Sequence, residues 1–497
     1  MAQRHLDRLT AVDASFLHQE GPSSHMHVGG LTLLEGPPPP LEEFLEQIRK
    51  RLHLVPRYRH KLAHTHTALD SGRPVWVDDP SFNLEYHVRH TALPAPGDWE
   101  QLCNLTARIF SQQLDRSKPL WEMWLIEGLD PKIGDPARPG RPQDDRGGVG
   151  GSKSYERCAL ISKTHHSLID GIAGIDLATV LFDLSPEPPP VRHSGRAWQP
   201  HREPNAIELL AAGAKGALRA GVELAAGAAD ALAHPDRALA TAREAAEGVG
   251  EIVWAVLNPA PATPLNVDIG PHRRFAGVGA ALADFKVVKN AFGCTVNDVV
   301  LAVVAGALRD LMIARGVRTE GLELRALVPV SVRAEDEHQH LGNRIVAMRG
   351  PLPVYIPDPV QRLLFVKREM DGLKESKQAL GAEVIAGVQN FAPPTILAQA
   401  SRLNFSTRLF NLLVTNVPGP QFPLYVLGRK MLEAYPVAFL PQHHALAIAI
   451  MSYNGQMNFG LLGDLDAMDD IDEFAESIAA QLATLVSLAR DVAALPA

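Results

Sequence analysis

Along the first half of the chain, short apolar runs alternate with segments whose apolar residues recur at helical spacing. Val28–Leu34, Trp121–Glu127 and Cys158–Lys163 are short runs typical of strands, the last typical of a buried one. Leu41–Leu54 and residues 99–114 carry one apolar stripe each, which predicts amphipathic helices. This alternation predicts an α/β fold.

Two stretches interrupt this pattern. Residues 130–154 are rich in Pro, Gly, Asp and Arg, which predicts a long exposed loop. Residues 186–205 are rich in proline and polar side chains and read as a linker. Alanine-rich segments at 206–234 and 237–257, separated by Pro235, predict two helices after that linker.

The second half again mixes strand and helix patterns. Asn454-Gly455 separates two apolar runs, and this dipeptide is the strongest short signal for a β-hairpin. The elements predicted here are a helix opening at Thr295, a buried strand at Leu324–Val330, hairpin strands at Leu446–Ser452 and Gln456–Leu462, and a terminal helix at Ile471–Ala493.

A chain of 497 residues is too long for one ordinary core, because single cores stop growing at roughly 250–300 residues. We therefore expect two domains and a connector. The predicted ranges are 1–185 for the N-terminal domain, 186–263 for the linker and helical connector, and 264–497 for the C-terminal domain.

Composition narrows the class of partner. With 46% hydrophobic and 21% charged residues the chain resembles a soluble globular protein, and a net charge of -8 gives no field that attracts nucleic acid. The three cysteines, Cys103, Cys158 and Cys294, are too widely spaced for a disulfide framework or a CxxC metal site. The N-terminal residues lack a secretory signal, and no uncharged apolar run approaches the roughly 18 residues of a membrane span. These features predict a cytoplasmic protein whose membrane contact is peripheral.

Reactive groups are concentrated in the segment HHSLIDG, residues 165–171. Adjacent side chains on a strand point to opposite faces, so His165 and His166 cannot both face one substrate unless the strand has ended, and one of them is expected to be structural. A neutral imidazole, with a pKa near 6.5, is suited to accept a proton near neutral pH. Asp170 lies one helical turn further on, where a carboxylate can hold the turn by pairing with an arginine.

Each of these residues also has a plainer interpretation. An isolated histidine is usually packed or exposed without a catalytic role, and Asp170 is equally suited to a helix start or a turn. The HHxxxD spacing is not that of HExxH and no third ligand is evident, so no metal site is predicted. The pair His443-His444 shows that two histidines also occur without a following Asp-Gly. The sequence contains no GxSxG nucleophile elbow, P-loop or GxGxxG motif.

HHSLIDG resembles the HHxxxDG motif of the bacterial wax ester synthase/diacylglycerol acyltransferase family, a branch of the coenzyme A-dependent acyltransferases. Further blocks agree with that family in order and spacing, over nearly the whole chain. They are LTAVDASFL near the start, LDRSKPLWEMWLIEGL at 114–129, PLN and GPHRR between Pro264 and Arg274, TVNDVVLA at 295–302, VPVSVR at 328–333, LGNR at 341–344, NVPGP at 416–420 and SYNG at 452–455.

The resemblance implies two chloramphenicol acetyltransferase-like domains with mixed sheets and a tunnel at their interface. By motif position, His166 is the catalytic base, His165 its neighbour and Asp170 the residue that orients the loop. Gly171 leaves backbone room at the turn, although glycine there is also explained by tight packing. The family motif suggests that Asn297, next to a predicted helix N-terminus, either donates a hydrogen bond to the thioester oxygen or positions the substrate, whereas Asp298 fits a capping box with Thr295.

The same resemblance implies acyl-coenzyme A as co-substrate, without a bound cofactor. The implied acceptor is diacylglycerol, giving triacylglycerol, or a long-chain alcohol, giving a wax ester, at a membrane or lipid-inclusion surface. Two alternatives stay open. The protein could take acyl groups from a carrier-protein thioester during complex lipid assembly, or it could be a catalytically weak lipid-binding member with an intact tunnel.

Overall fold

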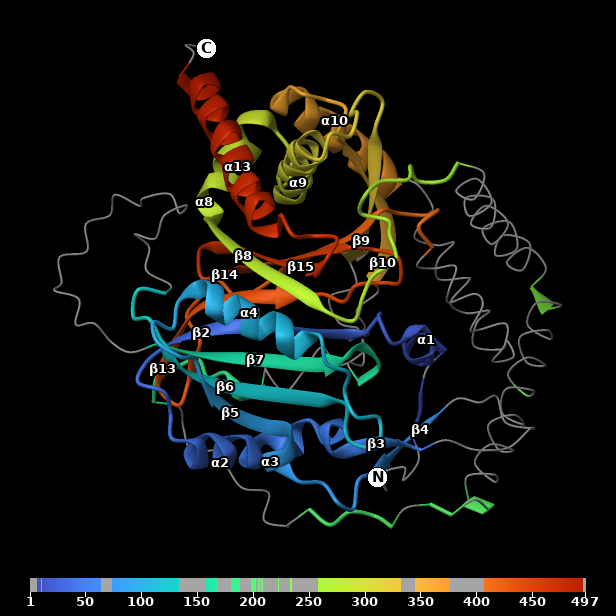
Figure 1. Ribbon diagram of the computed structural model, residues 1–497, viewed down its shortest axis with the longest axis vertical. Helices are drawn as coiled ribbons and strands as arrows, with labels where there is room; N and C mark the ends of the chain where they lie inside the picture. The colour runs from blue at the N-terminus through green and yellow to red at the C-terminus, as the bar shows by residue number, and fades with distance from the viewer. Residues whose placement is uncertain are drawn as a thin grey trace.

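The computed structural model describes residues 7–9, 11–63, 74–133, 157–168, 180–187, 258–331, 345–375 and 406–494, with a few positions between 198 and 234. Two six-stranded mixed sheets lie one above the other along the long axis of the molecule (Figure 1). A three-stranded sheet lies beside them, with the order β1 (Asp7–Arg8), β4 (Val75–Asp78), β3 (His60–Ala63).

The first large sheet is built mainly from the N-terminal half of the chain. Its strands follow the order β12 (Tyr425–Val426), β13 (Arg429–Val437), β2 (His27–Glu35), β7 (Arg157–His165), β6 (Trp121–Leu129) and β5 (Val88–Ala92). Its associated helices are α1 (Ala11–Gln19), α2 (Leu41–Arg51), α3 (Leu84–His87) and α4 (Trp99–Phe110), with short 3-10 turns at Leu52–Leu54, Pro56–Arg59 and His166–Leu168. Helices α2 and α3 cover the outer side of this sheet, and α4 lies on the side facing the second sheet (Figure 1).

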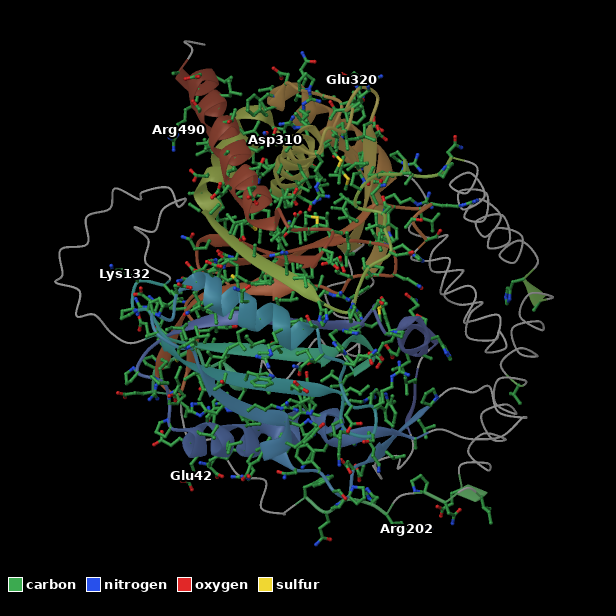
Figure 2. All side chains as sticks on the ribbon, viewed as in Figure 1. Glu42, Lys132, Arg202, Asp310, Glu320 and Arg490 are labelled. Atoms are coloured by element: carbon green, nitrogen blue, oxygen red, sulfur yellow. The ribbon has the colours of Figure 1, made fainter. Side chains whose placement is uncertain are left out.

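The second sheet comes from the C-terminal half. Its order is β10 (Ile345–Pro353), β9 (Glu323–Ser331), β11 (Leu412–Pro418), β14 (Leu446–Tyr453), β15 (Gln456–Asp464) and β8 (Arg273–Ala281). Four helices cover its outer face: α8 (Leu282–Phe292), α9 (Val296–Ala314), α10 (Pro359–Glu375) and α13 (Ile471–Ala494) (Figure 1). Side chains fill the space between the two sheets, and Glu42 on α2 and Arg490 on α13 lie near opposite ends of the molecule (Figure 2).

Local sequence explains why these elements begin and turn where they do. The Thr295 hydroxyl accepts the Asp298 backbone N–H at 3.2 Å, and the Asp298 carboxylate accepts the Thr295 N–H at 2.8 Å, so the predicted capping box opens α9. Asn454 and Gly455 have φ of 44° and 83°, the positive values that a type I′ hairpin turn requires. They join β14 to β15, which confirms the predicted hairpin.

The other predicted strands and helices within the described ranges are also confirmed. The strands predicted at 28–34, 121–127 and 158–163 extend one or two residues further as β2, β6 and β7. The amphipathic segments at 41–54 and 99–114 contain α2 and α4. Most of the predicted loop at 130–154 and nearly all of the connector lie outside the described residues.

One feature of the fold crosses the predicted domain ranges. Strands β12 and β13 belong to the range 264–497, yet β13 pairs antiparallel with β2 of the N-terminal sheet, with Tyr435 opposite Leu31. The C-terminal half therefore supplies two strands of the first sheet. The ranges themselves stay a prediction of how the chain divides.

Within the described part of the chain, no individual helix has the length and apolarity needed to cross a membrane. Helices α8 and α9 meet that test only as a pair, and they meet at an angle of 101°.

Candidate active site

The histidine pair lies at the C-terminal end of strand β7, a central strand of the first sheet. This strand lies between β2 and β6, and its last residue, His165, is opposite His27 of β2. Beyond it the chain leaves the strand in a 3-10 turn, His166–Leu168. The backbone N–H of His165 donates to Leu120 O at 3.0 Å, and that of His166 donates to Met26 O at 2.8 Å. Both residues are thus held by backbone bonds, and their side chains diverge into different surroundings.

The His165 ring is buried in a polar cluster. Its Nδ1 accepts the backbone N–H of Ser167 at 3.1 Å and lies 2.7 Å from Ser167 Oγ. Its Nε2 lies 3.5 Å from Glu20 Oε2. Because Nδ1 accepts a backbone proton, the ring proton of neutral His165 is on Nε2 and faces the carboxylate. The structure thus places His165 against the turn and the Glu20 carboxylate, and the division of the pair into a structural and a catalytic histidine stays a prediction.

His166 instead packs among aromatic rings. Its ring is stacked on Phe16 of α1, with centroids 4.0 Å apart and an interplanar angle of 23°. Phe439, which follows β13, meets it edge-on at 5.7 Å and 87°. Burial and, to a smaller extent, the neighbouring His165 together lower the pKa of His166 to about 4. The residue as a whole is partly exposed, and because its pKa is lowered the ring is an unprotonated imidazole at neutral pH.

Glu20 is the main charge of the cluster next to the pair. Burial alone would raise its pKa, but contacts with His165, His27 and Arg116 hold that pKa far below its usual range. The pKa of His27, which is fully buried, is lowered to about 3, again mainly by burial. At neutral pH the Glu20 carboxylate therefore lies beside the Arg116 guanidinium, the unprotonated imidazole of His27 and the ring of His165.

The remaining predicted site residues differ in what the structure says of them. Asp170 and Gly171 lie outside the described residues, so their roles stay predictions. Asn297 is the second residue of α9, and its Oδ1 accepts a hydrogen bond from Asn416 Nδ2 of β11 at 3.3 Å. The structure thus brings His165 and His166 together and pairs Asn297 with a residue of the NVPGP block.

Sequence reasoning missed three neighbours of the histidines: Phe16, Glu20 and Phe439. Phe16 lies in the LTAVDASFL block, which agrees with the family, and Glu20 follows it closely. That agreement was the available signal, but nothing local in the sequence says that this block reaches the histidines. Phe439 has no such signal.

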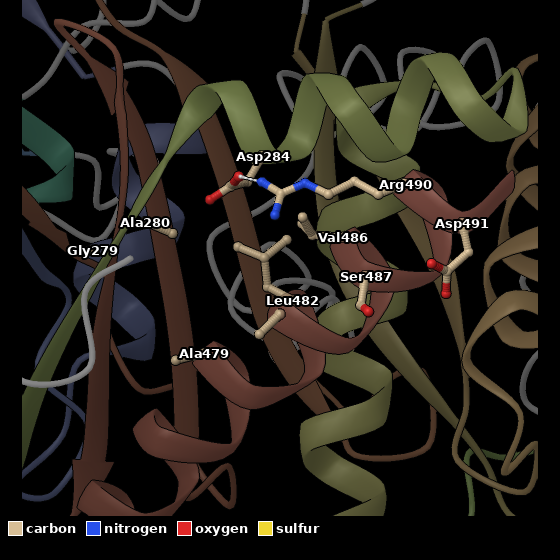
Figure 3. Close-up of a pocket in the computed structure, with 10 residues that line it drawn as sticks. Gly279, Ala280, Asp284, Ala479, Leu482, Val486, Ser487, Arg490 and Asp491 are labelled. Atoms are coloured by element: carbon tan, nitrogen blue, oxygen red, sulfur yellow. Dashed lines mark ion pairs between the residues drawn. The ribbon is translucent and has the colours of Figure 1, made fainter. Parts of the chain in front are cut away.

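A cavity of about 450 Å³ lies elsewhere, between β8, α8 and α13 (Figure 3). An ion pair of 3.8 Å joins Asp284 to Arg490 at this cavity. Its other lining residues include Gly279, Ala280, Leu482 and Val486. None of the residues around His166 lines it, so it is not the predicted tunnel, which stays a prediction.

Comparison with known proteins decides the family. The "Wax ester synthase/diacylglycerol acyltransferase catalytic domain" matches residues 9–132 and 151–300, and the "WS/DGAT C-terminal domain" matches residues 341–486. The chain belongs to the wax ester synthase/diacylglycerol acyltransferase family. It is 33% identical over 489 residues to the Mycobacterium tuberculosis protein named "Probable diacyglycerol O-acyltransferase tgs1", covering 98% of this chain and 97% of that one.

Solved structures agree with this assignment. The wax ester synthase/diacylglycerol acyltransferase from Marinobacter aquaeolei VT8 is similar with a TM-score of 0.63 and 27% identity, covering 97% of this chain and 99% of that chain. The starter condensation domain of rhizomide synthetase RzmA, at 13% identity and a TM-score of 0.54, covers 99% and 95% and shares the fold. The predicted family, acyltransferase fold and class of enzyme, an O-acyltransferase of the diacylglycerol acyltransferase/wax ester synthase type, are therefore confirmed.

Proposed function

We propose that the protein transfers a long-chain acyl group from acyl-coenzyme A to the hydroxyl of diacylglycerol, and also of long-chain alcohols, with His166 as general base. The observation that carries the proposal is the state of His166. It is a neutral imidazole at the end of a central strand, held between two aromatic rings and adjacent to a hydrogen-bonded turn. An acceptor of protons in apolar surroundings suits a lipid alcohol as substrate.

In this mechanism His166 accepts the hydroxyl proton as the alcohol oxygen attacks the thioester carbonyl. The C–S bond then breaks, and the imidazolium returns the proton to the departing thiolate. General-base assistance contributes on the order of 10²- to 10⁴-fold, so orientation and stabilisation of the oxyanion supply the rest. Since Asn297 Oδ1 accepts from Asn416, the Asn297 amide N–H group is oriented to donate, and we assign it to the oxyanion.

The names of the relatives support the diacylglycerol acceptor. The Mycobacterium tuberculosis relative is named a diacyglycerol O-acyltransferase, and the Marinobacter protein carries both the wax ester synthase and the diacylglycerol acyltransferase name. The fold is shared with a condensation domain whose structure contains C8-CoA, which supports a coenzyme A thioester as donor. A carrier-protein thioester is the competing donor.

The test is release of thiol from palmitoyl-coenzyme A with diacylglycerol, hexadecanol or a sterol as acceptor, with products identified by chromatography. His166→Ala should lower kcat on the order of 10²- to 10⁴-fold while acyl-coenzyme A binding persists. His90→Ala is a matched control, since His90 lies on the edge strand β5 and pairs with Glu127. Turnover by His166→Ala near the wild-type rate would remove His166 from the mechanism. Turnover only with an acylated carrier protein would replace the donor.

We also propose that the protein works in the cytoplasm, peripherally on membranes or lipid inclusions. Its substrates are apolar, and exposed apolar side chains such as Val417 and Phe422, about half exposed each, offer contact without charge. With a net charge of -8, attachment should depend on apolar contact more than on salt-sensitive attraction. Liposome flotation that moderate salt abolishes, and anionic lipid restores, would contradict this.

A further inference from the structure

Glu20 is a buried carboxylate on which three segments of the chain converge. It directly follows α1, and only 4% of its side chain is exposed. Its Oε2 accepts the Arg116 Nε–H at 2.8 Å and is also bonded by Arg116 Nη2. His27 Nε2 lies 3.5 Å from Oε1, and His165 Nε2 lies 3.5 Å from Oε2. Removing a carboxylate from water is costly unless such partners compensate, so the arrangement calls for an explanation.

Two neighbours, the Ser167 backbone N–H and the Glu20 carboxylate, both favour a proton on Nε2 in a neutral His165. With the proton on Nε2, the ring faces Glu20 with a donor and faces the Ser167 N–H with an acceptor. With the proton on Nδ1, a lone pair would face the carboxylate and two N–H groups would face each other. The negative charge of Glu20 therefore favours the tautomer that binds the turn.

This hydrogen bond ends on the residue after the proposed base. Ser167 N–H is the amide that joins His166 to Ser167, so the chain of contacts runs from Glu20 through His165 to the backbone of the turn His166–Leu168. The two residues on either side of His166 are thereby anchored through the same ring.

Glu20 also connects to the other side of the base. Its backbone N–H donates to Phe16 O at 3.1 Å, which closes the last turn of α1. Phe16 is the ring stacked on His166. The side chain of Glu20 thus contacts His165, which binds the turn. Its backbone bonds Phe16, whose ring is stacked on His166.

We propose that Glu20 is a positioning residue for His166, which holds the turn of the base by keeping His165 in the Nε2–H tautomer. The proposal rests on the proposed function of His166. Glu20 touches no reacting atom in this scheme. Its loss should therefore reduce kcat, while the KM for acyl-coenzyme A stays within about twofold of the wild-type value.

The experiment compares Glu20→Gln with Glu20→Leu in the full chain. Glutamine keeps an oxygen that can accept from His165 Nε2–H, whereas leucine is of similar size and accepts nothing. We expect Glu20→Leu to lower kcat on the order of 10- to 100-fold, because a displacement of about 1 Å at a reacting group can cost about 100-fold. Glu20→Gln should recover most of that loss. Arg315→Met is the control for stability, since it removes an ion pair with Asp470, which directly precedes α13, where Arg315 Nε lies 2.8 Å from a carboxylate oxygen.

A second readout does not depend on activity. Nitrogen-15 NMR of histidine-labelled protein, with His165→Gln to assign the signals, reports which ring nitrogen carries the proton. The wild type and Glu20→Gln should show His165 protonated on Nε2, and Glu20→Leu should show a mixture of tautomers. A wild-type His165 protonated on Nδ1 would overturn the inference, whatever the enzyme does.

The two readouts also separate this inference from the proposed function. The predicted tautomer change with an unaltered kcat in Glu20→Leu would refute the positioning role and leave His166 as the base. An equal loss of kcat in Arg315→Met and Glu20→Leu, at equal loss of stability, would likewise refute it. Wild-type protein that transfers no acyl group but shows the tautomer change would refute the proposed function and support the link from Glu20 to the turn.

Discussion

His166 should remain an active base at a pH where an ordinary histidine is already protonated. Its pKa is lowered to about 4 by burial among aromatic rings, against about 6.5 for an unperturbed imidazole. The protonated ring cannot accept the hydroxyl proton, so kcat/KM should follow the neutral fraction of the free enzyme.

The size of the effect follows from the two pKa values. At pH 5.5 a base of pKa 6.5 is about 9% neutral, whereas one of pKa about 4 is about 97% neutral. We therefore expect kcat/KM at pH 5.5 to be nearly that at pH 7.5, with a decline only as pH approaches 4. An unperturbed base would have lost about 90% of the rate by pH 5.5.

Thiol release at subsaturating acyl-coenzyme A, measured from pH 4 to pH 8, tests this, with circular dichroism to show that the protein stays folded. Phe16→Ala opens one face of the ring to water, so the acidic decline should move up toward pH 6.5. Phe82→Ala is the matched control, because Phe82 is stacked on another histidine, His87, and should leave the profile unchanged. A wild-type decline centred near pH 6.5, unaltered by Phe16→Ala, would refute the account of His166 in its aromatic surroundings.

Three further predictions concern stability. Lys163 is fully buried, and its Nζ donates to two carbonyls at the end of α4 beside Glu122. Lys163→Met should therefore lower the free energy of unfolding, measured with urea, by about 3–5 kcal/mol. A decrease under about 1 kcal/mol would contradict this. Asn458 is buried, and its amide has no hydrogen-bond partner in the described part of the chain. Asn458→Leu should therefore raise the free energy of unfolding by about 1–3 kcal/mol. A decrease would show that a buried water binds the amide. Burial lowers the pKa values of His27, His166 and His444 to about 3, 4 and 4, so the unfolded chain binds more protons below pH 6.5. The free energy of unfolding should fall between pH 6.5 and 4, by at most about 1.4 kcal/mol per pH unit for each histidine. Chemical denaturation at several pH values measures this change, and a free energy that does not vary with pH would contradict it.

Local signals in the sequence predict local structure well in this chain. The hairpin at Asn454-Gly455 and the capping box at Thr295 each depend on residues within a few positions, and both are present. The strand that carries the histidines was also evident, because Cys158–Lys163 is a continuous apolar run apart from its last residues. Alternation of side chains also predicts that His165 and His166 cannot share one environment, and the two rings do lie in different surroundings.

The rest of the site depends on contacts between residues distant in sequence. Phe439 is 273 positions after His166, and no periodicity indicates that it meets the ring edge-on. Glu20 reads in the sequence as an ordinary charged residue after a helix, and only the fold shows that it is buried beside His165. The pairing of β13 with β2 is similarly invisible, since each strand would satisfy the same pattern with another partner.

Because of these long-range contacts, the surroundings of the His166 ring depend on residues from both halves of the chain. The segment between α1 and β2 makes two hydrogen bonds with the C-terminal half: Ser24 Oγ donates to Leu440 O at 2.8 Å, and Arg273 of β8 donates to Ser23 O. The same segment begins with Glu20, and Leu440 follows the Phe439 that contacts His166. Residues of the C-terminal half therefore supply both the edge-on contact to His166 and two contacts to the segment that begins with Glu20. The HHxxxDG segment supplies the imidazole, but its neutral state and its orientation come from residues on both halves.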